Sequence, residues 1–310
     1  MSAPRYRDLP VIPELGLPHA WDVFGAGDEL GTLNWLTPQR VRAAAAEIRT
    51  GERVGLNLPL TSPDPALYRR HVLTHEIYPK ARNLWDDRID GLYPQGSTQW
   101  DGFRHVRARE FGFYGGELSD PPEMGSRLGI GRWAERGIVG RGVLIDVDRY
   151  LTDSQPLTDR AIDADELRAA ADSQGVQVRP GDILCLRFGW LAAYDGLDDG
   201  TKQRFADDSA GMHFTGLRSS DAVAELLWDW NVAAVVSDSP GVEVSPPRPG
   251  EGSIHRRLIP LLGMPLGELF DLDELSRRLS DEGRSSFFFS AVPLRLPGGV
   301  GSPANAVAVL

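Results

Sequence analysis

The sequence has one cysteine, no long apolar run and no block of basic residues. Because Cys185 is the single cysteine among 310 residues, no internal disulfide can form, which fits a reducing compartment. No stretch of about 18 apolar residues occurs, so we expect no membrane-spanning helix. The first residues also lack the apolar core of a signal peptide. These absences predict a cytoplasmic protein with no membrane partner.

The charge balance is acidic. The chain has 33 Lys and Arg against 44 Asp and Glu, a formal net charge of −11. Nucleic-acid surfaces need clustered positive charge, and none is present, so we expect no nucleic-acid partner. The 41% apolar and 25% charged residues are typical of a globular protein. We therefore look for a small-molecule site in a folded domain.

Hydrophobic periodicity and turn residues predict both helices and strands. Residues 1–30 are rich in Pro and Gly and predict an irregular N-terminal arm, and residues 61–96 predict loops long enough to be a functional insertion. Helices are predicted over residues 37–51, 163–173, 219–230 and 271–279. Strands are predicted over residues 54–60, 142–147, 183–187, 232–236, 286–296 and 306–310. Because the elements mix without strict alternation or a clear linker, we expect one α/β domain with a mixed sheet spanning residues 1–310.

The densest polar cluster runs from Gln95 to His105. Side chains two residues apart in an extended segment point to the same face, so Gln95, Gln99 and Asp101 can converge with His105. Carboxylate, amide and imidazole groups held on one side suit a hard-metal or acid–base site. From these residues alone, a polar loop beside a turn is the alternative.

This segment resembles the signature His-x-Gly-Thr-His-x-Asp-x-Pro-x-His of the putative cyclase superfamily, which includes bacterial kynurenine formamidases and isatin hydrolases. Thr98, Asp101 and His105 match the signature, whereas Gln95 and Gln99 stand at its first two histidines. Further stretches that resemble the family are residues 180–190, 213–217, 235–240 and 293–303. The resemblance covers the chain from about Gly31 to the C-terminus.

The resemblance implies a swivelling β/β/α fold, a homodimer or homotetramer, and hydrolysis of a cyclic or aryl amide or of a lactone. It implies a metal site, because Glu225 follows His213 at the twelve-residue spacing at which the family places a metal-binding glutamate. It also implies that His105 carries protons beside the metal, a task that suits the ordinary pKa of histidine. The implied ligands of one Mn²⁺ or Zn²⁺ ion are Gln99, Asp101, His213 and Glu225.

The two glutamines depart from the family pattern. A glutamine binds metal through a neutral carbonyl oxygen, a weaker ligand for zinc than imidazole. Two alternatives therefore stay open: a metal-independent cyclase or dehydratase that uses His105 and Asp101, and a non-catalytic small-molecule binder. In a metal-free site, Asp101 and Glu225 would act as acid and base.

Four residues are predicted to contact the substrate. Gln95 would orient it, and Trp85 would bring an aromatic wall to the pocket, unless its segment is a solvated loop. Trp100 and Phe103 would pack against the substrate or against a neighbouring subunit. Cys185 lies in an apolar run and is predicted to be a core residue.

Overall fold

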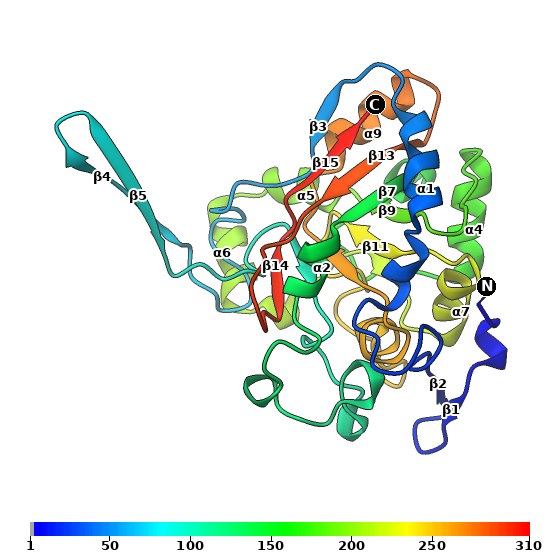
Figure 1. The fold of residues 1–310 in the computed structure, drawn as a ribbon. Coiled ribbons are helices and arrows are strands. Elements are labelled where there is room, and N and C mark those ends of the chain that lie inside the picture. Colours follow the sequence, from blue (N-terminus) through cyan, green and yellow to red (C-terminus); the bar gives the residue numbers. More distant parts are fainter. Residues whose placement is uncertain (1–2) are drawn as a thin grey trace.

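A computed structural model describes residues 3–310. Its centre is one mixed sheet of nine strands in the order β14-β6-β12-β11-β9-β7-β13-β15-β3 (Figure 1). The strands β7, β9, β11 and β12 run parallel to one another, and the other pairs in the sheet are antiparallel. In chain order the nine strands are β3 (Arg53–Gly55), β6 (Gln99–Asp101), β7 (Ile138–Asp146), β9 (Ile183–Arg187), β11 (Ala234–Ser237), β12 (Leu266–Glu268), β13 (Ser286–Ala291), β14 (Gly301–Pro303) and β15 (Ala306–Val309). The mixed α/β architecture predicted from the sequence is confirmed.

Helices cover the sheet, and capping side chains set where several of them begin. The α-helices are α1 (Pro38–Ala44), α2 (Gly131–Arg136), α3 (Val147–Tyr150), α4 (Ala164–Ser173), α5 (Trp190–Asp195), α6 (Asp199–Asp207), α7 (Asp221–Asp229), α8 (Ile254–Arg256) and α9 (Asp273–Asp281). The Thr37 hydroxyl accepts a hydrogen bond from the Arg40 N–H at the start of α1. Asp163 and Ser220 cap α4 and α7 in the same way. These side chains satisfy N–H groups that the first turn of a helix leaves free.

The central strands form the core. Residues 183–186 of β9, Cys185 among them, are fully buried, as expected for a parallel strand covered on both faces. Two strands are shorter than the sequence predicts. The strand expected over residues 54–60 ends at Gly55, and the one expected over residues 286–296 ends at Ala291, two residues before Pro293. Proline lacks the N–H that a sheet ladder requires, which explains the second boundary.

Residues 3–30 contain two short paired strands, β1 (Val11–Ile12) and β2 (Leu17–Pro18), and a 3₁₀ turn, η1 (Tyr6–Asp8). Leu9, Ile12 and Ala20 are buried, so this segment packs onto the domain. A second 3₁₀ turn, η3 (Ala45–Glu47), continues α1. Within residues 3–310 no helix has the length and apolarity needed to cross a membrane.

The prediction of loops over residues 61–96 is wrong in part. The strands β4 (Thr74–Ala81) and β5 (Leu84–Asp90) form an antiparallel hairpin. It projects far from the rest of the molecule (Figure 1) and forms a two-stranded sheet of its own. The Pro, Asp and charged residues in this stretch hide the strand pattern, because both faces of the hairpin are exposed to solvent and only one is apolar.

Candidate functional site

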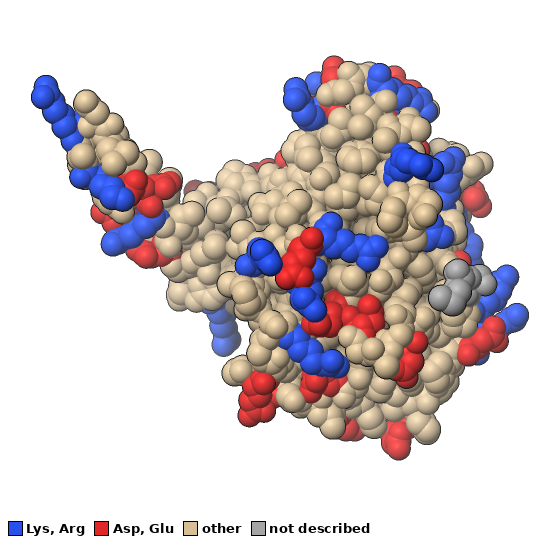
Figure 2. Space-filling model, in the orientation of Figure 1, with Lys and Arg blue, Asp and Glu red and all other residues tan. Residues whose placement is uncertain are grey.

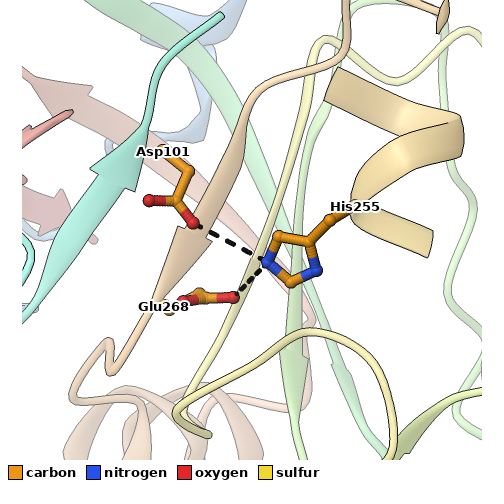
Figure 3. A group of neighbouring side chains, drawn as sticks. All are labelled: Asp101, His255 and Glu268. Carbon is orange, nitrogen blue, oxygen red and sulfur yellow. Dashed lines mark hydrogen bonds and ion pairs between the residues drawn. The ribbon is translucent and has the colours of Figure 1, made fainter. Parts of the chain in front are cut away.

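Three side chains from three elements meet near one edge of the sheet (Figure 3). Asp101 ends β6, Glu268 ends the neighbouring β12, and His255 lies on α8. His255 Nε2 lies 2.9 Å from Glu268 Oε1 and 3.7 Å from Asp101 Oδ2. One ligand atom from each residue lies within 4.8 Å of the other two, so the group could hold a metal ion. Asp101 and Glu268 are buried.

A third carboxylate lies behind His255. Glu243 Oε1 is 3.2 Å from His255 Nδ1. The same carboxylate accepts hydrogen bonds from the hydroxyls of Ser219 and Ser253 at 2.9 and 3.0 Å and from the backbone N–H of Ile254. Burial raises the pKa of Glu243, but His255 and these donors outweigh it and hold the pKa at about 2. Glu243 thus stays ionised and turns Nε2 of His255 toward Asp101 and Glu268.

The charges of the cluster act on one another. Burial lowers the pKa of His255, yet the carboxylates of Glu243 and Glu268, together with the nearby Asp101, raise it well above its ordinary value. Burial raises the pKa of Asp101, whereas His105, His255 and Gln95 lower it, and the net direction is down. Positive charge at the centre of this cluster is therefore favourable.

Both glutamines lie in the site, each beside one carboxylate. Gln99 Nε2 donates to Glu268 Oε2 at 2.8 Å. Gln95 Nε2 donates to Asp101 Oδ1 and lies 3.0 Å from His105 Nδ1. The structure thus brings Gln95, Gln99, Asp101 and His105 together, as their spacing in the sequence predicts.

The donor set fits a divalent cation. Asp101 Oδ2 and Gln99 Oε1 are buried and have no hydrogen-bond partner, which is costly unless another group satisfies them. Two carboxylates, one imidazole and an amide oxygen suit Mn²⁺, and zinc also accepts such nitrogen and oxygen ligands. Asp101, His255 and Glu268 would hold the ion, and Gln99 Oε1 is available as a further ligand.

His105 lies at the open side of the cluster. Its Nε2 is 3.7 Å from Asp101 Oδ2, and its ring centroid is 6.3 Å from that of His255. The His105 side chain is 30% exposed, compared with 14% for His255 and 1% for Asp101. His105 is therefore the imidazole that solvent and an incoming molecule reach first.

Tyr68, which sequence reasoning did not single out, lies near the charges of the cluster. Its hydroxyl lies 3.5 Å from the carbonyl oxygen of Pro240. Burial raises the pKa of the phenol, and the carboxylates of Glu268 and Asp101 raise it further, so the hydroxyl stays protonated near these residues. Tyr68 and Arg69 both have positive φ angles, 56° and 57°. Such strained backbone is often found at functional sites.

Two of the predicted ligands lie outside the cluster. His213 is exposed. Glu225 lies on α7, where its carboxylate acts together with burial and Asp221 to raise the pKa of Tyr6. Across residues 3–310, neither His213 nor Glu225 belongs to a group of three ligands close enough to hold a metal. The fold instead brings His255 and Glu268 to Asp101. These two residues are thirteen apart in the sequence, close to the family's spacing of twelve, and this spacing could have identified them.

Three of the predicted substrate contacts do not face the cluster. Trp100 is fully buried against Phe270 and Phe289, because alternate side chains of a strand point to opposite faces and its neighbours Gln99 and Asp101 face the site.

Phe103 is also fully buried, against Tyr114 and Trp133. Trp85 lies on the hairpin, 63% exposed, and so forms no wall of the site in its own chain.

Comparison with known proteins is consistent with this architecture. The family model described as putative cyclase matches residues 71–244. A crystal structure described as a novel cyclase superposes with a TM-score of 0.84 at 29% identity, covering 94% of this chain and 99% of that one. Isatin hydrolase A from Labrenzia aggregata has a TM-score of 0.58 at 16% identity, covering 86% and 94% of the two chains. The enzyme of the same name from Ralstonia solanacearum has a TM-score of 0.57 at 18% identity, with 88% and 97% covered.

A search of curated proteins found no match. The two isatin hydrolases share the fold with this chain. The family model covers more than half of the 310 residues and includes Asp101 and His105. The chain belongs to the putative cyclase family.

Proposed function

We propose that the protein is a hydrolase that cleaves a cyclic or aryl amide, or a lactone, with one divalent metal ion. The observation that carries this proposal is the convergence of Asp101, His255 and Glu268 beside an exposed His105. We further propose that it works in the cytoplasm as a homo-oligomer on a small-molecule substrate. The isatin hydrolases that share the fold act on a cyclic amide, and this supports the choice of substrate class.

The proposed ligands are Asp101, His255 and Glu268, with the amide oxygen of Gln99. A divalent ion bound there supplies a Lewis acid that polarises a carbonyl group and lowers the pKa of water. Glu243 holds His255 in the ring orientation that points Nε2 at the two carboxylates. This set replaces His213 and Glu225, which lie elsewhere.

His105 transfers the proton in this proposal. Its Nε2 faces Asp101, while Nδ1 contacts Gln95 at 3.0 Å. In the structure the Gln95 N–H group faces both Nδ1 of His105 and Oδ1 of Asp101. A turn of this amide would place its carbonyl oxygen on a protonated Nδ1 and leave Nε2 free, in exchange for the hydrogen bond to Asp101. Nε2 then takes a proton from water and returns it to the leaving nitrogen or oxygen.

The proposed roles of Gln95 and Tyr68 concern the substrate. Gln95 also keeps Asp101 Oδ1 engaged, which leaves Oδ2 for the ion. The protonated hydroxyl of Tyr68 can donate to a substrate oxygen that gains negative charge, the kind of contact that stabilises an oxyanion.

The metal-free alternative also rests on specific contacts. Glu268 accepts hydrogen bonds from Gln99 and from His255, and Asp101 accepts one from Gln95. A protonated His255 would then balance the carboxylates, and His105 with Asp101 would perform acid–base chemistry of the cyclase or dehydratase type.

One experiment separates these functions. The purified protein is analysed for metal, treated with a chelator, reloaded with Mn²⁺ or Zn²⁺, and assayed at each step with isatin, a formyl anilide and a lactone. The hydrolase proposal expects about one ion per chain and turnover that is lost with the ion and restored by it. Equal turnover in the chelated protein supports the metal-free enzyme instead, and tight binding without turnover supports a binder.

A further inference from the structure

Arg70 lies next to the candidate site. Its Nη1 donates a hydrogen bond to the backbone carbonyl oxygen of Gln95, the residue whose side chain contacts Asp101 and His105. The central carbon of the guanidinium lies 5.4 Å from the centre of the Tyr68 ring, so the positive charge packs over that ring. Arg70 is therefore connected to the site through Gln95 and through Tyr68.

The Tyr68 hydroxyl is close to Arg70 and to the cluster at the same time. Burial is the main reason that the pKa of this phenol is raised, and Glu268 raises it further. His255 and Arg70 act in the opposite direction and lower the pKa. Because the interaction between charges weakens with distance, the guanidinium and the cluster both lie near this hydroxyl.

Most of the hydrogen-bond donors of Arg70 have no partner in the protein. An arginine has five N–H donors in a planar fork. Within residues 3–310, the Arg70 side chain makes one hydrogen bond, to Gln95, and no ion pair. The side chain is half-buried, so its charge is partly withdrawn from water. A carboxylate that accepts two parallel N–H bonds is the group that fits such a fork.

A hollow of about 440 Å³ lies beside the site, and Arg70 lines it. The exposed Arg69 and His71 line the hollow from the same segment, and α6 contributes Gln203 and Asp207. Pockets of roughly 300–1,000 Å³ are typical of small-molecule sites. The hollow is thus large enough for an organic acid next to the cluster.

The rest of the described chain offers no general attraction for an anion. The net charge is −11, and basic and acidic side chains are interspersed over the face that Figure 2 shows. A negatively charged molecule therefore needs a local positive charge, which Arg70 and Arg69 supply. Asp64 and Asp207 also line the hollow, and they favour the single negative charge of a carboxylate over a phosphate dianion.

We propose that Arg70 binds a carboxylate group of the substrate, so that the protein acts on amides or lactones that also carry an acid. A substrate held by its carboxylate at Arg70 and by its carbonyl group at the cluster has two fixed points, which set its orientation. The inference rests on the proposed hydrolase for the reaction, whereas binding of the acid group can be measured without it.

The first test compares substrates that differ only in the acid. The three isomers of formamidobenzoate and the neutral formanilide are assayed by release of formate: water adds a hydroxyl to the formyl carbon, the C–N bond breaks, and the nitrogen takes the proton. Wild type is expected to favour at least one acid by about tenfold or more in kcat/KM. Arg70→Gln should lose this preference, chiefly through a higher KM for the acid, and Arg70→Lys should recover part of it. The matched control is Arg42→Gln, at an exposed arginine of α1, which should keep the preference. A wild type that favours formanilide over all three acids, or a preference unchanged in Arg70→Gln, overturns the proposal.

The second test measures binding without turnover. Benzoate is titrated by calorimetry into the purified protein, as isolated and after chelation, because a carboxylate can also coordinate a metal. In both forms Arg70→Gln is expected to raise the Kd for benzoate by about tenfold or more relative to wild type, and Arg42→Gln to leave it unchanged. Thermal unfolding of the variants checks that they are folded. Equal binding by wild type and Arg70→Gln, or no binding by wild type, contradicts the proposal. A protein that binds benzoate through Arg70 but cleaves none of the amides keeps the carboxylate site and rejects the hydrolase, so the two failures are told apart.

Discussion

At the residue scale, exposure separates the histidines into different roles. His105 is partly exposed beside Asp101, His255 is nearly buried among carboxylates, and His213 lies on the surface. An acid–base group must reach both the substrate and solvent, whereas a metal ligand needs fixed orientation. This difference favours His105 as proton carrier and His255 as ligand.

Replacing His105 should remove most of the activity and should change the stability of the fold only slightly. We expect His105→Ala to lower turnover by roughly two to four orders of magnitude, the usual loss for a general acid–base group. The matched control is His213→Ala, at an exposed position outside the cluster, which should keep turnover near wild type. Turnover of both variants, with thermal unfolding as a check on folding, measures this. A fully active His105→Ala would remove that residue from the mechanism.

The same Glu-to-Gln substitution at two positions tests which residues bind the metal: those that the fold brings together, or those that the sequence spacing predicts. Glu268→Gln removes a charged ligand from the cluster, so metal content should fall by tenfold or more, whereas Glu225→Gln on α7 should leave it unchanged. Mass spectrometry of metal in dialysed protein provides the measurement. The reverse pattern would restore His213 and Glu225 as the site.

At the element scale, Asp238 joins two strands and a helix. It follows β11, and its Oδ1 accepts the N–H of Phe188 at 2.7 Å after β9. Its Oδ2 accepts the N–H groups of Gly189 and Trp190 at 2.8 and 3.1 Å, where α5 begins. Gly189 has a φ of +78°, a conformation that glycine adopts without strain. One buried carboxylate therefore holds the turn from β9 to α5.

Asp238→Asn should destabilise this connection. The amide nitrogen cannot accept a hydrogen bond, so at least one buried N–H loses its partner, at a cost of about 2–3 kcal/mol. Asp273→Asn is the control, since Asp273 also contacts this region through Arg187 but is 37% exposed, and its loss should be below about 1 kcal/mol. Urea unfolding of both variants compares these values. Equal stability of the two variants would mean that the N–H groups find other partners.

At the scale of the whole molecule, pH acts on stability through carboxylates that tie distant segments together. Glu47 of η3 accepts hydrogen bonds from Arg141 of β7 at 2.9 Å and from Ser286 of β13 at 2.8 Å. Burial raises the pKa of Glu47, but the contacts with Ser286 and Arg141 outweigh it and lower the pKa below its usual 4.5. A lowered pKa means that the folded state binds this proton less readily than the unfolded chain.

The stabilisation by Glu47 is therefore present above about pH 4.5 and is lost as pH falls below it. We expect Glu47→Gln to cost about 1–2 kcal/mol at neutral pH. The difference from wild type should shrink at pH values below 4.5, where the wild-type carboxylate is protonated as well. Urea unfolding of wild type and variant at neutral pH and below pH 4.5 measures this difference. A difference that stays constant with pH would show that packing, and not charge, is responsible.

Sequence patterns predicted much of the framework. The helix starts at Thr37, Asp163 and Ser220 depend on local capping, and β9 depends on a short apolar run, so neighbouring residues determine them. The polar cluster from Gln95 to His105 was predictable for the same reason, because side chains a few residues apart share a face whatever the rest of the chain does.

Only the tertiary structure determined which residues from distant parts of the chain form the site. Glu268 reaches Asp101 because β12 pairs with β6, a register that no local pattern reveals, and His255 reaches both carboxylates from α8. Trp100 points into the core because β6 turns Gln99 and Asp101 toward the site. The hairpin β4–β5 was not predicted from the sequence, because its apolar face is not buried in this chain. Local order follows from nearby residues, whereas a site assembled from separate elements depends on which strands pair, and the burial of the whole chain determines that pairing.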